Sequence, residues 1–182
     1  MLATIYVLIA VAVRVVAGTG TFATLGFTPV GASLLFFGAR MPRKFFFFPV
    51  ALLIASDLYL NQRVYGMPLT WDQGLIFAWY AGALLIGSLL RNRIKPVYVG
   101  GAALASAISF FAISNFGVWA SGYVGYPHTW AGLAACYVAA IPFFEKGIVS
   151  DLVFSAAFFA IPALFAYMLG ETAKAAGKDR AA

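Results

Sequence analysis

Six apolar runs separated by short gaps account for most of this chain of 182 residues. Crossing about 30 Å of hydrocarbon takes roughly 20 helical residues, and somewhat fewer where a packed bundle thins the bilayer. Hydrophobic residues make up 63% of the chain and charged residues 10%, which is more apolar surface than one soluble core can hide. The sequence therefore predicts an all-α integral membrane protein with six transmembrane helices. They span approximately Leu2 to Val16, Leu25 to Ala39, Phe45 to Leu60, Gly74 to Leu90, Val97 to Trp119 and Gly147 to Leu169.

Basic residues concentrate in two gaps and in the C-terminal tail, where they are Arg40, Arg43, Lys44, Arg91, Arg93, Lys95, Lys174, Lys178 and Arg180. Such an excess is typical of cytoplasmic loops. We therefore expect both termini in the cytoplasm, one transmembrane domain over residues 1–170 and a short basic cytoplasmic tail over residues 171–182. Because the net charge of +6 sits in these gaps, we expect a lipid bilayer and no nucleic acid as partner.

A further apolar run, Trp130 to Phe144, is too short for a full crossing, because 15 residues reach only about 22 Å as a helix. A seventh crossing would also place the basic tail outside. We therefore expect an outer or re-entrant half-helix that leads into the sixth transmembrane helix.

Four polar side chains interrupt the apolar runs, where each would be costly if it faced lipid unpaired. Counting from the expected membrane entry points places Arg14 and Asp57 about 18 Å from the inner face, and Asp151 about one turn below the outer face. Asn115 falls near the outer end of its helix. This layout predicts a substrate-binding pocket open to the outside. Alternatively, Arg14 forms a structural ion pair with Asp57 or Asp151.

The outward loops and helix ends are rich in aromatic rings, which suit stacking on a flat or conjugated ligand. Single Trp and Tyr residues also gather at any membrane interface, and a histidine beside a proline is commonly a solvated loop residue. Both interpretations stay open for these rings, which are Tyr59, Tyr65, Trp71, Trp79, Trp119, Tyr123, Tyr126, His128 and Trp130.

Motifs of catalysis are missing from the sequence, which contains no HExxH, GxSxG or CxxC pattern and no Gly-rich phosphate loop. Its single cysteine, Cys136, excludes an internal disulfide and the paired-cysteine metal sites. Flanked by alanines, Cys136 is either a small buried hydrophobe or a contact to a metal or cofactor. We expect no enzyme activity, no metal and no cofactor.

The segment IPFFEKGIVSDLVF, residues 141–154, resembles the start of the last helix in the substrate-binding membrane subunits (S components) of energy-coupling factor (ECF) vitamin transporters. Pro142, Phe143, Lys146 and Gly147 match the motif, whereas Phe144 replaces its usual asparagine. The resemblance implies six helices in the bacterial cytoplasmic (inner) membrane, with an outer ligand pocket. The chain is also similar to a small uncharacterised bacterial membrane family, through residues 26–39, 56–60, 114–119 and 126–154.

The resemblance implies that the chain binds a micronutrient, such as a vitamin or a corrinoid, for uptake. The expected substrate-binding residues are Arg14, Asp57, Asn115, Trp119, Tyr126, His128, Trp130, Lys146 and Asp151. Partners are either an ECF transmembrane coupling subunit with its ATPases, or none, as in solitary S components. The first helix lacks the alanine pair with which many S components dock on the coupling subunit. The alternative function is a non-transporting structural or accessory subunit of a larger membrane complex. A channel or proton-coupled carrier would need polar residues through the whole membrane thickness, and the inner halves of these runs are apolar.

Overall fold

The computed structural model describes residues 1–20 and 27–179, with side chains to residue 169. These residues form helices and no strands, which confirms the predicted all-α fold. The α-helices are α1 (Leu2–Thr19), α2 (Val30–Arg40), α3 (Phe47–Tyr59), α4 (Gln73–Ser88), α5 (Pro96–Ser121) and α6 (Trp130–Asp179). A 3₁₀ turn, η2 (Arg43–Phe45), precedes α3, and a π-helical turn, η3 (Leu60–Val64), extends it.

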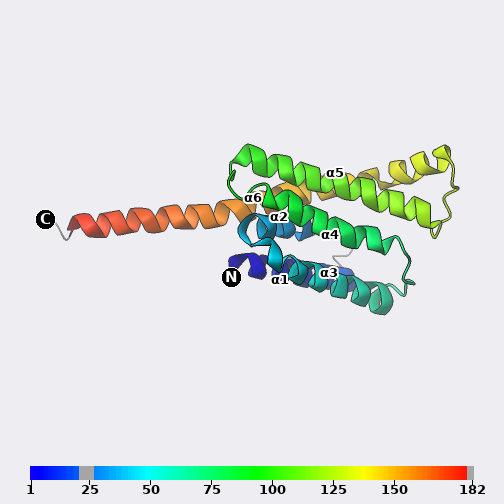
Figure 1. The fold of residues 1–182 in the computed structure, drawn as a ribbon, viewed down its shortest axis with the longest axis horizontal. Coiled ribbons are helices and arrows are strands. Elements are labelled where there is room, and N and C mark those ends of the chain that lie inside the picture. Colours follow the sequence, from blue (N-terminus) through cyan, green and yellow to red (C-terminus); the bar gives the residue numbers. More distant parts are fainter. Residues whose placement is uncertain (21–26, 180–182) are drawn as a thin grey trace.

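Successive helices run in alternating directions through one bundle (Figure 1). The connections from α2 to α3 and from α4 to α5 lie at the same end as the N-terminus, and they carry six of the basic residues named above. The connections from α3 to α4 and from α5 to α6 lie at the opposite end. The basic gaps therefore share one end of the bundle.

Four helical segments among the described residues are long and apolar enough to cross a membrane: Leu2–Thr19, Arg43–Val64, Pro96–Ser121 and Trp130–Leu169. Two further apolar helices, α2 and α4, are shorter than a full crossing. The second predicted run began at Leu25, which lies outside the described residues, and its helix begins at Val30. These spans indicate a membrane protein.

The short helix α2 occupies the centre of the bundle, because every residue from Val30 to Ala39 is buried and only Arg40 is exposed. Two glycines bring it against α4. A Cβ atom at Gly38 would collide with the carbonyl oxygen of Leu84, and one at Gly87 with that of Leu35. Small residues at such crossings let helix backbones approach closely.

The structure does not confirm a separate half-helix before the last span. The run Trp130 to Phe144 continues without a break into the rest of α6, which includes Pro142 and Pro162. A proline removes one backbone hydrogen bond, and apolar helices tolerate this where neighbouring groups compensate. In Figure 1, α6 extends well past the basic end of the bundle. Its helical residues continue to Asp179, beyond the domain boundary expected at residue 170.

Because α6 is continuous, Asp151 lies far from the first residue of its helix. Counted from Trp130, this residue lies roughly 21 residues, or about 31 Å, along the helix. The expected depth of one turn below the outer face was counted from a helix start near Gly147, whereas the helix that contains Asp151 begins at Trp130. Asp151 instead lies inside the bundle beside α2 and α5.

Candidate functional site

A cavity of about 610 Å³ lies between the helices and receives side chains from all six of those described. Its volume falls within the range of small-molecule sites, about 300–1,000 Å³. Most of its wall is apolar, and its polar groups are few. The polar and charged lining residues are Arg14, Thr28, Asp57, Asn61, Gln73, Ser114, Asn115, Ser150 and Asp151.

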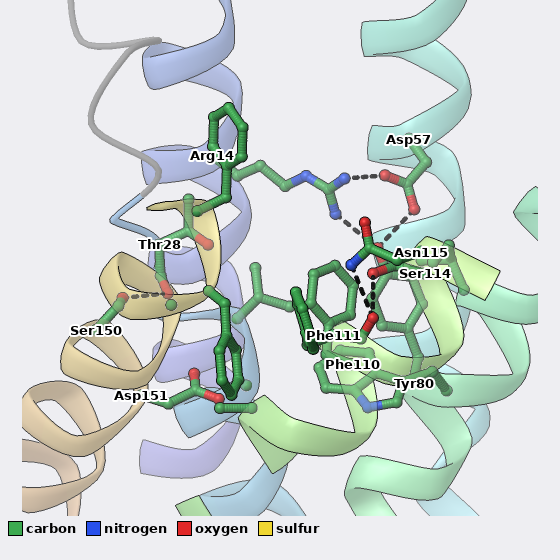
Figure 2. Close-up of a pocket in the computed structure, with 18 of the residues that line it drawn as sticks. Arg14, Thr28, Asp57, Tyr80, Phe110, Phe111, Ser114, Asn115, Ser150 and Asp151 are labelled. Carbon is green, nitrogen blue, oxygen red and sulfur yellow. Dashed lines mark hydrogen bonds and ion pairs between the residues drawn. The ribbon is translucent and has the colours of Figure 1, made fainter. Parts of the chain in front are cut away.

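On one side of the cavity, Arg14 of α1, Asp57 of α3 and Tyr80 of α4 form a closed network (Figure 2). One guanidinium nitrogen of Arg14 pairs with Oδ1 of Asp57, and the other donates to the Tyr80 hydroxyl at 2.7 Å. The Tyr80 hydroxyl donates in turn to Oδ2 of Asp57 at 2.6 Å. The Arg14–Asp57 pairing is thus one of the alternatives predicted from the sequence, and both residues also line the cavity.

Tyr80 is the member of this network that the sequence analysis missed. Only 2% of its surface is exposed, and its hydroxyl joins two charged groups from other helices. A phenol in the middle of an apolar helix needs a hydrogen-bond partner, which is a signal the sequence contained. The neighbouring Trp79, expected at the outer interface, is instead buried and donates from Nε1 to the Ser109 hydroxyl at 3.0 Å.

Asp151 lies on the opposite side of the cavity, next to Ser150 (Figure 2). Its residue is 8% exposed, and the fully buried Ser106 of α5 lies beside its carboxylate. A Cβ atom at Gly31 of α2 would collide with both carboxylate oxygens, so the glycine makes the space that the carboxylate occupies. Within the described part of the chain, no Lys, Arg or His forms an ion pair with it.

Asn115, the fourth predicted residue that lines the cavity, extends from α5. Its side-chain amide donates to the Phe111 carbonyl oxygen at 2.8 Å, one turn earlier in the same helix. The Ser150 hydroxyl on α6 similarly donates to the Thr28 carbonyl oxygen at 2.9 Å. These bonds hold the polar groups in fixed positions on the cavity wall.

Three other predicted site residues lie apart from this cavity. Trp119, His128 and Trp130 surround a small hollow of about 140 Å³ together with Thr129. The rings of Trp119 and His128 are 5.5 Å apart at their centroids, and Trp119 donates from Nε1 to the Pro127 carbonyl oxygen at 2.9 Å. Trp130 is 86% exposed. These rings therefore do not cover the larger cavity.

Tyr126 and Lys146 line neither hollow. Tyr126 is half-buried in the connection between α5 and α6, and Lys146 is exposed on α6. Phe143 and Gly147, by contrast, belong to the segment that carried the family resemblance and do line the cavity.

Aromatic rings form much of the cavity wall, and of these the sequence analysis named only Tyr65, Trp79, Phe143 and Phe144. Phe111 of α5 and Phe144 of α6 stack with centroids 4.3 Å apart. Phe111 precedes Asn115 by one helical turn, a spacing that could have placed it on the same face. The aromatic lining residues are Phe27, Tyr65, Phe77, Trp79, Tyr80, Phe110, Phe111, Phe143 and Phe144.

The cavity has apolar and aromatic walls and polar groups fixed at two opposite sides, an arrangement that suits the binding of a small molecule. Among the residues that the structure describes, no three His, Cys, Asp or Glu side chains gather where they could hold a metal ion. Cys136 is buried, and its thiol lies 3.4 Å from the carbonyl oxygen of Asn115, outside the cavity lining.

Comparison with known proteins gives one match. No curated protein and no solved structure matches the chain. A family described as "Family of unknown function (DUF6580)" matches residues 1–173, a range that contains every residue lining the cavity. The chain therefore belongs to the DUF6580 family.

Proposed function

We propose that this protein is a substrate-binding membrane subunit that captures a small molecule, such as a vitamin or a corrinoid, for uptake. The observation that carries the proposal is the cavity of about 610 Å³ inside the helix bundle. Its aromatic walls suit a flat organic molecule, and its fixed polar groups suit the orientation of that molecule. Ionisable residues inside a membrane bundle commonly mark substrate pathways.

The proposal includes an orientation in the bacterial cytoplasmic membrane. In this orientation the chain crosses the bilayer six times, with both termini and the basic end of the bundle in the cytoplasm. Support comes from the basic residues in or beside the connections from α2 to α3 and from α4 to α5, which lie at the end of the bundle that holds the N-terminus (Figure 1). These residues are Arg40, Arg43, Lys44, Arg91, Arg93 and Lys95. The first part of α6, Trp130 to Phe144, is then the outer part of a long last crossing.

The resemblance to S components supports the same function, because Phe143 and Gly147 of the shared segment line the cavity. In this account the bundle tilts as a rigid body to release its substrate inside. It works either with an ECF coupling subunit and ATPases or alone.

Thermal unfolding with a panel of vitamins and corrinoids tests the proposal. A Cβ atom at Gly147 meets no described atom within 4 Å, so Gly147→Leu extends into the cavity without a backbone collision. Gly101 has the same open surroundings but lies on the exposed side of α5, which makes Gly101→Leu the matched control. At least one compound should stabilise the wild-type protein and Gly101→Leu but not Gly147→Leu. If no compound stabilises the wild-type protein, substrate capture is the wrong function.

A second candidate function, an accessory subunit of a larger membrane complex, is favoured by the end of α6. This segment extends past the bundle in Figure 1, and its apolar side chains are exposed at Ile161, Leu164, Phe165, Met168 and Leu169. An accessory subunit would keep its partner after purification in mild detergent and lose it when Leu164 and Phe165 become Ser. A substrate-binding subunit would keep its ligand in that variant.

A further inference from the structure

The charges on the cavity wall do not balance. Among the described residues that line it, the charged ones are Arg14, Asp57 and Asp151. Arg14 and Asp57 form an ion pair and neutralise each other. When Asp151 is ionised, its negative charge remains, and the wall formed by the described residues then has a net charge of −1.

The structure buries this remaining carboxylate instead of exposing it to water. Asp151 is more than nine-tenths buried, and Figure 2 shows its carboxylate directed toward the space enclosed by the lining residues. The neighbouring Ser106 offers a hydroxyl but no charge. A buried carboxylate without a cation is unfavourable, so a positive group at this position would be held strongly.

The start of α2 favours the ionised form of Asp151. This helix begins at Val30, and the Asp151 carboxylate lies against Gly31 in its first turn. The N-terminus of a helix carries a partial positive charge that stabilises a nearby anion. Since that charge is only about half a unit, most of the attraction of Asp151 for a cation remains.

The surface beside Asp151 suits the apolar body of an organic cation. Phe144, Gly147 and Asp151 follow one another at helical spacing on α6, and all three line the cavity. A Cβ atom at Gly147, which stands between the other two in the sequence, would meet no described atom within 4 Å. Phe111 stacks on Phe144 at the same wall. Aromatic faces attract positive charge as well as flat apolar groups.

We infer that the site binds an organic cation, an ammonium or a positively charged heteroaromatic ring, with its positive centre at Asp151 and its apolar body against Phe111 and Phe144. This inference rests on the proposed function, because it assigns the substrate class of the same cavity. The Arg14–Asp57–Tyr80 network on the opposite side is internally neutral and orients the polar end of the ligand.

Three small probes that differ mainly in charge test the inference on the full chain in detergent. They are benzyltrimethylammonium, which is cationic, N-benzylacetamide, which is neutral, and phenylacetate, which is anionic. Calorimetric titration should give the cation at least about tenfold tighter binding than either of the others. Asp151→Asn keeps the shape of the side chain and removes its charge, and should weaken cation binding by at least about tenfold.

The variants separate loss of charge from loss of fold. Gly147→Leu keeps the carboxylate and fills the space beside it, so cation binding should disappear, whereas Gly101→Leu should bind as the wild-type protein does. If Asp151→Asn fails to fold, two results still test the cation inference. They are the ranking of the three probes on the wild-type protein and the binding of the cation to Gly147→Leu. Equal binding of all three probes, or a preference for the neutral or anionic one, would overturn the cation inference. The proposal that the cavity binds a small molecule would then still stand. If none of the three binds and no vitamin stabilises the protein, the proposed function itself fails.

Discussion

Arg14 and Asp57, 43 positions apart in the sequence, form an ion pair inside the helix bundle, and both line its cavity of about 610 Å³. The pair joins α1 to α3, and Tyr80 extends it to α4. Ionisable groups in an apolar bundle are costly unless they are paired, so this network both stabilises the packing of three helices and fixes one side of the cavity.

The Arg14–Asp57 pair predicts strong coupling between the two side chains. Arg14→Leu or Asp57→Leu leaves the other charge buried, which should lower the free energy of unfolding by about 3 kcal/mol. The double variant removes both charges and should lose clearly less than the sum of the single losses. Reversible unfolding in mixed micelles, followed by tryptophan fluorescence, measures this cycle. Additive losses would show that the pair contributes no coupling.

The hydroxyl of Tyr80 should stabilise the same network. Tyr80→Phe removes one acceptor from Arg14 and one donor from Asp57, and should cost about 1–3 kcal/mol of unfolding free energy. Tyr98→Phe is the matched control, because Tyr98 is 45% exposed near the start of α5 and should change stability by less than about 0.5 kcal/mol. Equal effects of the two substitutions would contradict a role for the Tyr80 hydroxyl.

Gly31 should be required for the position of Asp151. In Gly31→Ala the added methyl group overlaps the carboxylate, so either α2 or Asp151 must move, at a cost of about 1–3 kcal/mol. Gly82→Ala on α4 meets no described atom within 4 Å and should gain about 0.5–1 kcal/mol from its better helix propensity. Opposite signs in thermal unfolding are therefore expected. If Gly31→Ala were as stable as Gly82→Ala, the contact between Gly31 and the Asp151 carboxylate would not be tight.

The proposed orientation predicts which positions react with a membrane-impermeant maleimide on intact cells. In a Cys136→Ala background, Val124→Cys in the connection between α5 and α6 should be labelled, because Val124 is 59% exposed at the proposed outer end. Arg93→Cys, exposed in the connection between α4 and α5, should be labelled only after the cells are lysed. Labelling of Arg93→Cys but not of Val124→Cys on intact cells would show that the orientation is opposite to the proposed one.

Part of the site was accessible to sequence reasoning because ionisable residues in apolar runs are few. Arg14, Asp57, Asn115 and Asp151 were singled out for that reason, and all four line the cavity. Their partners were harder to predict. Tyr80, Phe111 and Phe144 are common residues for an apolar helix, and only the packing of α4, α5 and α6 shows that they share a wall.

The continuity of α6 before Asp151 and the location of the outer rings away from the cavity were not predictable from residue types alone. Pro142 followed by Glu145 and Lys146 is typical of a helix end, but α6 continues through this segment. Trp119 and Trp130 lie at a loop where interface aromatics gather in any membrane protein, and nothing in their spacing separates that role from ligand contact. The fold class followed directly from the apolar runs, because their length and composition leave few alternatives.

The most direct test of substrate capture is native mass spectrometry of the protein purified from cells in mild detergent. One small molecule should be bound per polypeptide in the wild-type protein and in Gly101→Leu. Gly147→Leu, whose added side chain extends into the cavity, should be empty. Equal occupancy in all three proteins, or a bound molecule in Gly147→Leu, would contradict the assignment of the site to this cavity.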